Sequence, residues 1–469
     1  MTTAPYALEL GLGALMLLVF AIGLFGPRHD RRAAGVVAAG GVLVLGAMAM
    51  SLAPSGPALS GMFVQDGLAL FAKRVFLAAT FIGLLAGLGS AEPALRRRNA
   101  EYHVLVLASL LGMMVLASAR DIILLFLAFE LMSIPLYILT GFVKAQPEPI
   151  EASLKFFLVG SVSSAVMAYG LSFVYGATGG TSLAIIAKAP PSPLLTLGLL
   201  AVLAGLAFKI AAFPFHMWVP DTYEAATTPF VAWLSVAPKA AGFVTLFRVY
   251  FEGVGDRAAV WGPVAAGLAT VTMLGGNLMA LPQKNTKRLL AYSGIAQIGY
   301  MLVGLAAASA SGTAMVLFYL VAYVFANMGA FLVVEAVARS ERSEATSAFR
   351  GLAQRSPLLA LAMLLFLLSL GGVPFVAGFW AKLYVFWAAA ERGLYWLVLI
   401  GAVLTVVALF YYLLVARSMY IDAPVRPDRV PVTPALAVSL MLCVLGIVVL
   451  GLYPKGVVMA ALRVAAPLF

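Results

Sequence analysis

The sequence predicts an all-α protein that crosses a membrane many times, and two observations lead to this prediction. Of the 469 residues, 63% are hydrophobic and only 10% are charged, whereas a soluble domain carries about 25% charged residues. The apolar residues also fall into runs of about 20, the length that an α-helix needs to cross a bilayer core. Transmembrane β-strands alternate in short segments, so these unbroken runs indicate helices.

Fourteen apolar segments follow one another with short connections, and we expect each to cross the membrane. The twelfth is too long for one simple span and contains GGVPFVAGF. No stretch is left over for a soluble domain, so a single membrane domain over residues 1–469 is predicted. The approximate limits of the segments are 7–25, 33–52, 67–90, 101–119, 121–143, 152–176, 194–213, 228–251, 258–281, 289–310, 313–338, 357–390, 394–416 and 433–453.

The connections carry an orientation signal. Those on one side hold most of the loop lysine and arginine residues, including Arg96, Arg97, Arg98, Lys284 and Lys287. The positive-inside rule makes that side cytoplasmic, and an even number of spans then places both termini on the outer side. The same rule explains the net charge of +11 without a nucleic-acid partner.

Few residues could hold a metal or a redox centre. The only cysteine is Cys443, which excludes an internal disulfide and a cysteine-ligated zinc or iron–sulfur site within the chain. The three histidines, His29, His103 and His216, are far apart in the sequence, which argues against a paired-histidine haem site. The N-terminus has no basic region ahead of a short apolar core, so no signal peptide is expected.

Several charged residues lie inside the apolar segments, where each costs at least ~2.5–3.5 kcal/mol at mid-bilayer. Such residues usually face the protein interior and are candidates for function. They are Lys73, Arg74, Lys155, Lys209, Lys239, Lys382 and Glu130.

Each of these residues also has a structural interpretation. Lys73 and Arg74 lie two turns into their segment, so we expect them to extend to the membrane surface, and we expect Glu9 to lie at the interface. For Lys155, one turn into its segment, the two interpretations are balanced.

Three residues lie too deep for that explanation. Lys239 is near the centre of TPFVAWLSVAPKAAGFVTLFRVYF, and we expect it to function in proton transfer rather than in a static ion pair. Glu130 and Lys209 are the natural opposite-charge partners of each other. Lysines repel cations, and the segments hold few clustered carboxylates or hydroxyls, so this set of charges favours a proton relay over a sodium or sugar site.

Two segments combine a lysine with helix-breaking residues. Pro214 follows Lys209, and its missing N–H should end the seventh helix near residue 213, leaving carbonyl groups that favour a cation. In the twelfth segment Pro374 and Gly378 precede Lys382. Two interrupted membrane helices in matching positions are typical of transporters built from inverted repeats.

Three stretches carry a resemblance to a known family. FHMWVPDTYEAATTPFVAWLSVAPKAAGF (215–243), NTKRLLAYSGIAQIGYMLVGL (285–305) and GVPFVAGFWAKLYVF (372–386) resemble, in the same order, blocks of the antiporter-like membrane subunits of complex I, the proton-pumping NADH–quinone oxidoreductase. The sequence is most similar to the subunit N branch, because it stops after fourteen spans and has Lys382 where the subunit M branch has a glutamate.

The resemblance implies roles for the buried charges. Glu130 and Lys209 match the acid–lysine pair of the first half-channel, Lys155 the connecting lysine, Lys239 the central lysine and Lys382 the lysine of the second half-channel.

The resemblance also implies an architecture. It predicts two inverted five-helix repeats at residues 101–251 and 258–420, with three N-terminal helices in 1–100, a C-terminal helix in 421–469 and broken helices in spans 7 and 12.

The sequence departs from the family at a few positions. EAATTP stands where EGAPTP is usual, and Gly294 and Gln297 replace a common serine and histidine. These departures put in doubt a relay that uses a side chain at position 294 or 297.

The resemblance implies partners for this chain. No cofactor is expected within it; NADH, FMN, iron–sulfur clusters and quinone would be held by other subunits. The expected neighbours are subunit M, small subunits such as K, and the lipid of a bacterial plasma membrane, with both termini periplasmic.

Three functions remain open at this point. The first is a proton-translocating subunit of NADH–quinone oxidoreductase, and the second is a subunit of a stand-alone multi-subunit cation/proton antiporter. The third is a passive assembly subunit whose charges only hold helices together.

Overall fold

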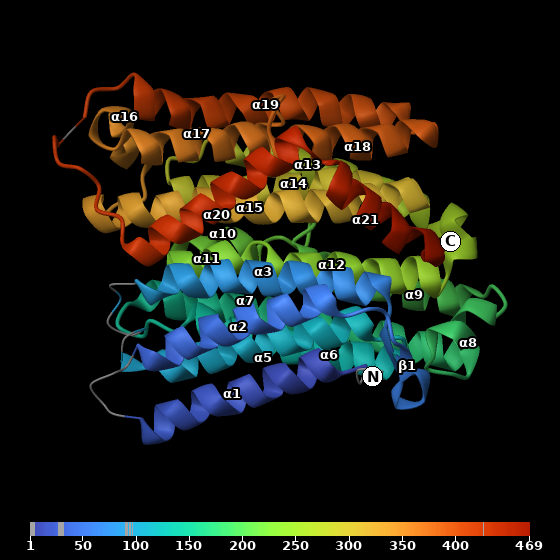
Figure 1. Ribbon diagram of the computed structural model, residues 1–469. Helices are drawn as coiled ribbons and strands as arrows, with labels where there is room; N and C mark the ends of the chain where they lie inside the picture. Colours follow the sequence, from blue (N-terminus) through green and yellow to red (C-terminus); the bar gives the residue numbers. More distant parts are fainter. Residues whose placement is uncertain (1–4, 27–31, 90–91, 93–94, 96, 425) are drawn as a thin grey trace. The chain divides into compact units, whose positions relative to one another are not determined.

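The computed structural model describes residues 5–26, 32–89, 92, 95, 97–424 and 426–469 (Figure 1). His29 and Arg96, named above, lie outside these residues. Within them, thirteen helical segments are long and apolar enough to cross a membrane. The chain is therefore an all-α polytopic membrane protein, as predicted. The remaining predicted span, the twelfth, consists of two shorter helices.

The helices begin and end close to the predicted limits. The long ones are α1 (Ala7–Phe25), α2 (Ala33–Ser51), α3 (Gly67–Leu88), α5 (Asn99–Ser118), α6 (Ile122–Thr140), α7 (Pro147–Thr178), α9 (Pro193–Ile210), α13 (Ala258–Ala280), α14 (Thr286–Ala306), α15 (Ala310–Glu341), α19 (Tyr395–Tyr420) and α20 (Pro434–Leu452). The thirteenth spanning segment joins α11 (Thr228–Leu234), α12 (Ala237–Phe247) and the turn Arg248–Glu252. The divided twelfth span is α17 (Pro357–Gly371) and α18 (Ala377–Glu391).

Shorter elements lie between or after these helices. They are the antiparallel pair β1 (Gly56–Ala58) and β2 (Phe63–Gln65), which the sequence did not predict, and the helices α8 (Leu183–Lys188), α10 (Trp218–Ala225), α16 (Leu352–Arg355) and α21 (Lys455–Ala465). Local sequence explains many of the helix starts. Asp66, Asp121 and Asn285 accept hydrogen bonds from backbone N–H groups of the first turn, which satisfies donors that a helix start leaves free.

The chain forms two compact units. The first unit comprises Met1–Ile210, Ala237–Trp261 and Arg463–Phe469, and the second comprises Ala211–Val236 and Gly262–Leu462. The chain therefore leaves the first unit directly after α9 and returns to it at α12. The two inverted five-helix repeats stay a prediction.

In the first unit, α12 forms the centre. All of its side chains are buried, and it packs against α3, α5 and α9. Around it α7 packs on α9, α5 on α6 and α2 on α3; α5 and α6 lie side by side in Figure 1. A helix that is buried on every side contacts neither lipid nor bulk water, so any charge on α12 must be accommodated by the surrounding protein.

In the second unit, α15 is the central helix. It packs against α11, α14, α17, α18 and α20, and nearly all of α14 and α15 is buried. Helices α17 and α18 run end to end below α19 in Figure 1. The division of the twelfth span therefore lies next to the buried helices of this unit.

One expectation about the N-terminal helices was wrong. Lys73 is fully buried, and its Nζ atom lies 2.7 Å from an oxygen of Glu9, which is itself only 8% exposed. Lys73 also donates to Gln65 and lies 4.9 Å from the ring centre of Phe63. An opposite charge and a hydrogen-bond acceptor at hand stabilise the ammonium inside the bundle, so it need not extend to the surface.

Candidate functional site

The segment after Lys209 leaves the helical path. Helix α9 ends at Ile210, Ala211 has a φ of 65°, and the Phe213–Pro214 peptide bond is cis. The backbone N–H of Phe213 donates to the Thr272 hydroxyl at 3.0 Å. The next α-helix, α10, begins only at Trp218. Lys209 therefore stands in the last turn of α9, where free carbonyl groups favour a cation.

Lys209 is held by a serine on the neighbouring α6. Its side chain is buried, and Nζ donates to the Ser133 hydroxyl at 2.8 Å. Ser133 in turn donates to the Phe129 carbonyl at 2.6 Å, so the hydroxyl proton points away from the ammonium and a lone pair faces it. The ammonium also lies 5.4 Å from the centre of the Phe129 ring.

Glu130 stands on the same helix, three residues before Ser133. It attracts the Lys209 ammonium electrostatically, but the direct contact of the lysine is with the serine. The Glu130 Oε1 atom is buried, and among the described residues it has no hydrogen-bond partner. The structure thus brings Glu130 and Lys209 to adjacent helices without closing them into a direct ion pair, and the carboxylate is left with unused hydrogen-bonding capacity.

Lys239 lies in the first turn of α12 and is fully buried. Close packing near it depends on Gly242, one turn later: a Cβ atom at this position would come within 2.6 Å of the Ile210 side chain. Gly242 therefore lets α12 approach the end of α9, where Lys209 stands.

Lys155 differs from the other predicted site lysines. Its side chain is 50% exposed, and Nζ lies 2.8 Å from an oxygen of Glu151 one turn earlier on α7. The structure therefore places Lys155 on an outer face of α7 and not with the buried lysines.

Lys382 lies at the division of the twelfth span. Its side chain is buried, Nζ lies 3.4 Å from the carbonyl oxygen of Gly371 at the end of α17, and it stands 4.3 Å from the centre of the Tyr300 ring. The ammonium thus meets the negative end of a half-helix and the face of an aromatic ring, both of which favour a cation.

Two glycines make this division possible. Gly372 has a φ of 80°, and a Cβ atom there would also lie 2.9 Å from the Lys382 side chain. At Gly378 a Cβ atom would lie 1.7 Å from the backbone oxygen of Ser369, while the Gly378 N–H donates to the Ser369 hydroxyl at 3.1 Å. Pro374 lies in the short connection between α17 and α18, together with Gly372.

A buried cluster around Arg248 was not identified from the sequence. The Arg248 side chain is fully buried and binds both oxygens of Asp66 at 2.6 Å, Glu252 at 2.9 Å and the Ala117 carbonyl at 3.1 Å. The cluster fixes the end of the segment that carries Lys239. The one signal in the sequence was Asp66, which stands directly before an apolar run in the position of a helix cap.

Ion pairs join two of the sequence blocks that suggested the family. Arg288, from NTKR, lies 2.9 Å from Asp221 and 2.7 Å from Glu224 of the PDTYE stretch. Lys287 donates to the Ala226 carbonyl at 2.9 Å and pairs with Glu344 at 2.8 Å. These contacts anchor α10 to the start of α14 within the second unit.

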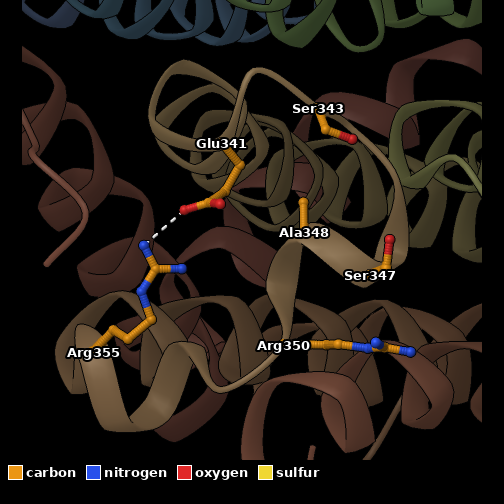
Figure 2. A pocket seen from close by; sticks show the side chains of 6 residues that line it. All are labelled: Glu341, Ser343, Ser347, Ala348, Arg350 and Arg355. Atoms are coloured by element: carbon orange, nitrogen blue, oxygen red, sulfur yellow. Dashed lines mark hydrogen bonds and ion pairs between the residues drawn. The ribbon is translucent and has the colours of Figure 1, made fainter. Parts of the chain in front are cut away.

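A polar pocket of about 250 Å³ lies at the end of α15 (Figure 2). One wall is the ion pair between Arg355 and Glu341, at 2.7 Å. The Arg355 Nε atom also donates to the Asp428 carbonyl at 2.8 Å, so this arginine is held from two sides. The lining residues are Glu341, Ser343, Ser347, Ala348, Arg350 and Arg355, and none is a predicted site residue.

Comparison with known proteins agrees with the fold. The family described as NADH:quinone oxidoreductase/Mrp antiporter, TM, matches residues 119–408. A curated relative, NADH-quinone oxidoreductase subunit N of Moorella thermoacetica, is 40% identical, with 98% of each chain covered. A chain of respiratory complex I from Thermus thermophilus is 32% identical at a TM-score of 0.83, over 97% of this chain and 99% of that one.

A chain of the Mrp complex from Dietzia has the same fold. Its TM-score is 0.88 over 99% of this chain and 98% of its own, at 21% identity, which bears on the fold alone. The match at 40% identity over nearly the whole length is far more specific. The chain therefore belongs to the NADH:quinone oxidoreductase/Mrp antiporter family, among the proteins of the subunit N type.

Proposed function

We propose that this chain is an antiporter-like, proton-translocating membrane subunit of an NADH–quinone oxidoreductase. In this proposal protons move through Glu130, Lys209, Lys239 and Lys382, driven by quinone reduction in other subunits. NADH, FMN, iron–sulfur clusters and quinone belong to those partners. The proposed neighbours are subunit M and small subunits such as K, in a bacterial plasma membrane with both termini periplasmic.

The burial of three lysines in membrane helices carries this proposal. The exposed fractions of Lys209, Lys239 and Lys382 are 2%, 0% and 4%. Charged residues at membrane depth are expensive and usually mark ion or proton pathways. Each of these lysines also lies next to an irregularity of the backbone or to a close approach of two helices. The free-energy cost of burying each charge therefore coincides with a particular local structure.

The contacts of Lys209 favour a relay over a static ion pair. In a static pair the carboxylate would be the direct partner of the ammonium. Here Ser133 is the direct partner, and Glu130 acts at longer range with a buried oxygen that is unused among the described residues. A small movement of the Glu130 side chain therefore changes the attraction between the two residues without breaking the hydrogen bond from Lys209 to Ser133. Such a pair can hold or release a proton on Lys209.

Lys155 has a different place in the proposal. Because it is half exposed on α7 and paired with Glu151, it does not extend the buried set within this chain. We propose that it connects the site to a neighbouring subunit that covers this face of α7.

The test is Glu130→Gln in the complete complex, with Glu101→Gln as the matched control. Glutamine keeps the shape of the side chain and removes its charge. Because Lys209 keeps its bond to Ser133, we expect the complex to assemble, while NADH–quinone turnover and proton pumping fall together. The control removes an exposed carboxylate in the first turn of α5, outside the proposed relay, and should leave pumping by this subunit nearly unchanged.

Three outcomes would count against the proposal. Full turnover and full pumping in an assembled Glu130→Gln complex would refute the relay. Loss of assembly with normal activity of the remaining complex would favour a passive structural subunit. Affinity purification through this chain tests the alternative of a stand-alone cation/proton antiporter. A redox complex should copurify with the chain, whereas a set of membrane subunits without flavin or iron would favour the antiporter.

A further inference from the structure

The end of α17 is held by side chains from two other helices. A helix leaves its last four carbonyl groups without partners inside the helix. In α17 the Leu370 carbonyl accepts from Gln297 Nε2 on α14 at 2.9 Å, and the next carbonyl, Gly371, accepts from Lys382 Nζ at 3.4 Å. A glutamine and the site lysine therefore bind adjacent oxygens of the same half-helix end.

The Gln297 side chain is fixed by three hydrogen bonds. Its Nε2 group donates to Leu370 and, at 3.2 Å, to the Tyr412 hydroxyl, and its Oε1 atom accepts from the Tyr319 hydroxyl. Gln297 is 1% exposed. A flipped amide would set its oxygen against the Leu370 carbonyl, so the observed orientation is the one that satisfies every partner.

The two tyrosines are themselves held in place. The Tyr412 hydroxyl is hydrogen-bonded to Ser293, one turn before Gln297 on α14. Its neighbour Tyr411 donates to the Asn277 side chain at 3.1 Å, which in turn donates to the Tyr300 hydroxyl at 3.3 Å. Tyr300 is the residue whose ring faces Lys382. The hydrogen bonds around Gln297 and those around the Tyr300 ring, which faces Lys382, thus meet at the neighbouring residues Tyr412 and Tyr411.

We propose that Gln297 is a positioning residue for Lys382: it fixes the end of α17 so that the Gly371 carbonyl faces the lysine ammonium. This inference rests on the proposed function, in which Lys382 takes part in proton transfer. An amide neither gains nor loses a proton at physiological pH, so Gln297 acts through geometry and does not carry the proton itself. It is absent from the set of site residues predicted from the sequence.

The test compares four variants in the complete complex. Gln297→Met keeps the length and removes all three hydrogen bonds, whereas Gln297→His retains one donor and one acceptor. Gln283→Met is the matched control, because among the described residues that side chain bonds only within its own turn, to Met279 at 2.8 Å. Lys382→Met removes the ammonium. Turnover and protons pumped are measured per assembled complex.

We expect Gln297→Met to lower turnover about fivefold, which corresponds to the loss of one ordinary hydrogen bond at the lysine-binding end. On the same scale, the turnover of Gln297→His should stay within about twofold of the wild-type turnover, and the turnover of Gln283→Met should equal that of the wild type. In a Lys382→Met background, Gln297→Met should add less than about twofold, because a residue that acts through Lys382 has nothing left to act on.

Each other outcome overturns the inference. Normal turnover in Gln297→Met, with Lys382→Met impaired, refutes the positioning role and leaves the proposed function intact. Equal effects of Gln297→Met with and without Lys382 show that it acts elsewhere. Normal turnover in Lys382→Met removes both the proposed function of that lysine and this inference.

A failure of Gln297→Met to assemble can also be resolved. In that case Gln297→Asn, whose shorter side chain cannot reach all three partners, is compared with Gln297→His. A defect per complex in Asn but not in His supports the inference, and equal activity of the two overturns it.

Discussion

Gly378→Ala tests whether the division of the twelfth span is required for function. Gly378 stands at the start of α18, and Lys382 follows it by one turn. The added Cβ atom would lie 1.7 Å from the Ser369 backbone oxygen. Contacts below 3.0 Å are essentially never seen for Cβ atoms, so α17 and α18 would have to separate by at least about 1.3 Å (3.0 − 1.7).

This separation should affect the nearby lysine. The obstacle is a backbone atom, which cannot rotate away, so we expect a cost at the upper end of the range for overpacking, about 3 kcal/mol. The Gly378–Ser369 and Lys382–Gly371 contacts, at 3.1 and 3.4 Å, cannot both survive such a shift. Displacements of about 1 Å around a site can cost ~100-fold in rate, so turnover per complex should fall at least tenfold.

Two glycines of the same unit provide controls. At Gly371 a Cβ atom would meet the flexible end of Leu409 at 3.2 Å, and at Gly267 it would meet nothing within 4 Å. Alanine should therefore be mildly unfavourable at 371 and neutral or slightly stabilising at 267. The assay is the amount of assembled complex in membranes, with NADH–quinone turnover per complex. Equal results for Gly378→Ala and Gly267→Ala would refute the reasoning.

Two predictions concern charge pairs of the first unit. Burial raises the pKa of Asp66, but the hydrogen bonds and the charge of Arg248 outweigh burial and hold that pKa below its ordinary value. The stability that the Asp66–Arg248 pair contributes is therefore fully present above the ordinary pKa of Asp66. It is lost only as the pH falls through the lowered pKa. Asp66→Asn should thus destabilise the assembled complex by about 1–2 kcal/mol, given that Asp66 is partly exposed, and heat-inactivation half-lives should show the same difference from pH 8 to pH 5; a difference that shrinks within this range would contradict the assignment. Glu9→Met should lower the amount of assembled complex, because it leaves the Lys73 ammonium buried without its carboxylate, at a cost of about 3–5 kcal/mol. Glu9→Met combined with Lys73→Met should restore most of that amount, and a double variant no better than the single one would show that the pair is not the cause.

The candidate site was only partly predictable. Lys209, Lys239 and Lys382 could be recognised from the sequence because a charge inside an apolar run stands out wherever its helix packs. The expectation that Lys73 extends to the membrane surface failed, because the depth of a residue within its segment does not reveal whether an oppositely charged residue lies next to it on another helix. Sequence patterns did not identify Gln297 either, because an uncharged polar residue in an apolar helix has no distinguishing pattern; the resemblance singled out position 297 only as a departure from the family.

The sequence by itself determined what depends on residues close together in the chain. Runs of about 20 apolar residues are enough to place the spans, and Pro214 and Gly378 are enough to suggest where the seventh and twelfth spans are interrupted. Tertiary structure alone decided which groups meet: Ser133 and not Glu130 binds Lys209 directly, Lys155 lies on an outer face, and the pairs Glu9–Lys73 and Gln297–Leu370 form. The physical reason is that such contacts depend on the rotation of each helix about its axis and on its neighbours. In a chain that is hydrophobic on almost every face, the pattern of apolar residues does not specify either.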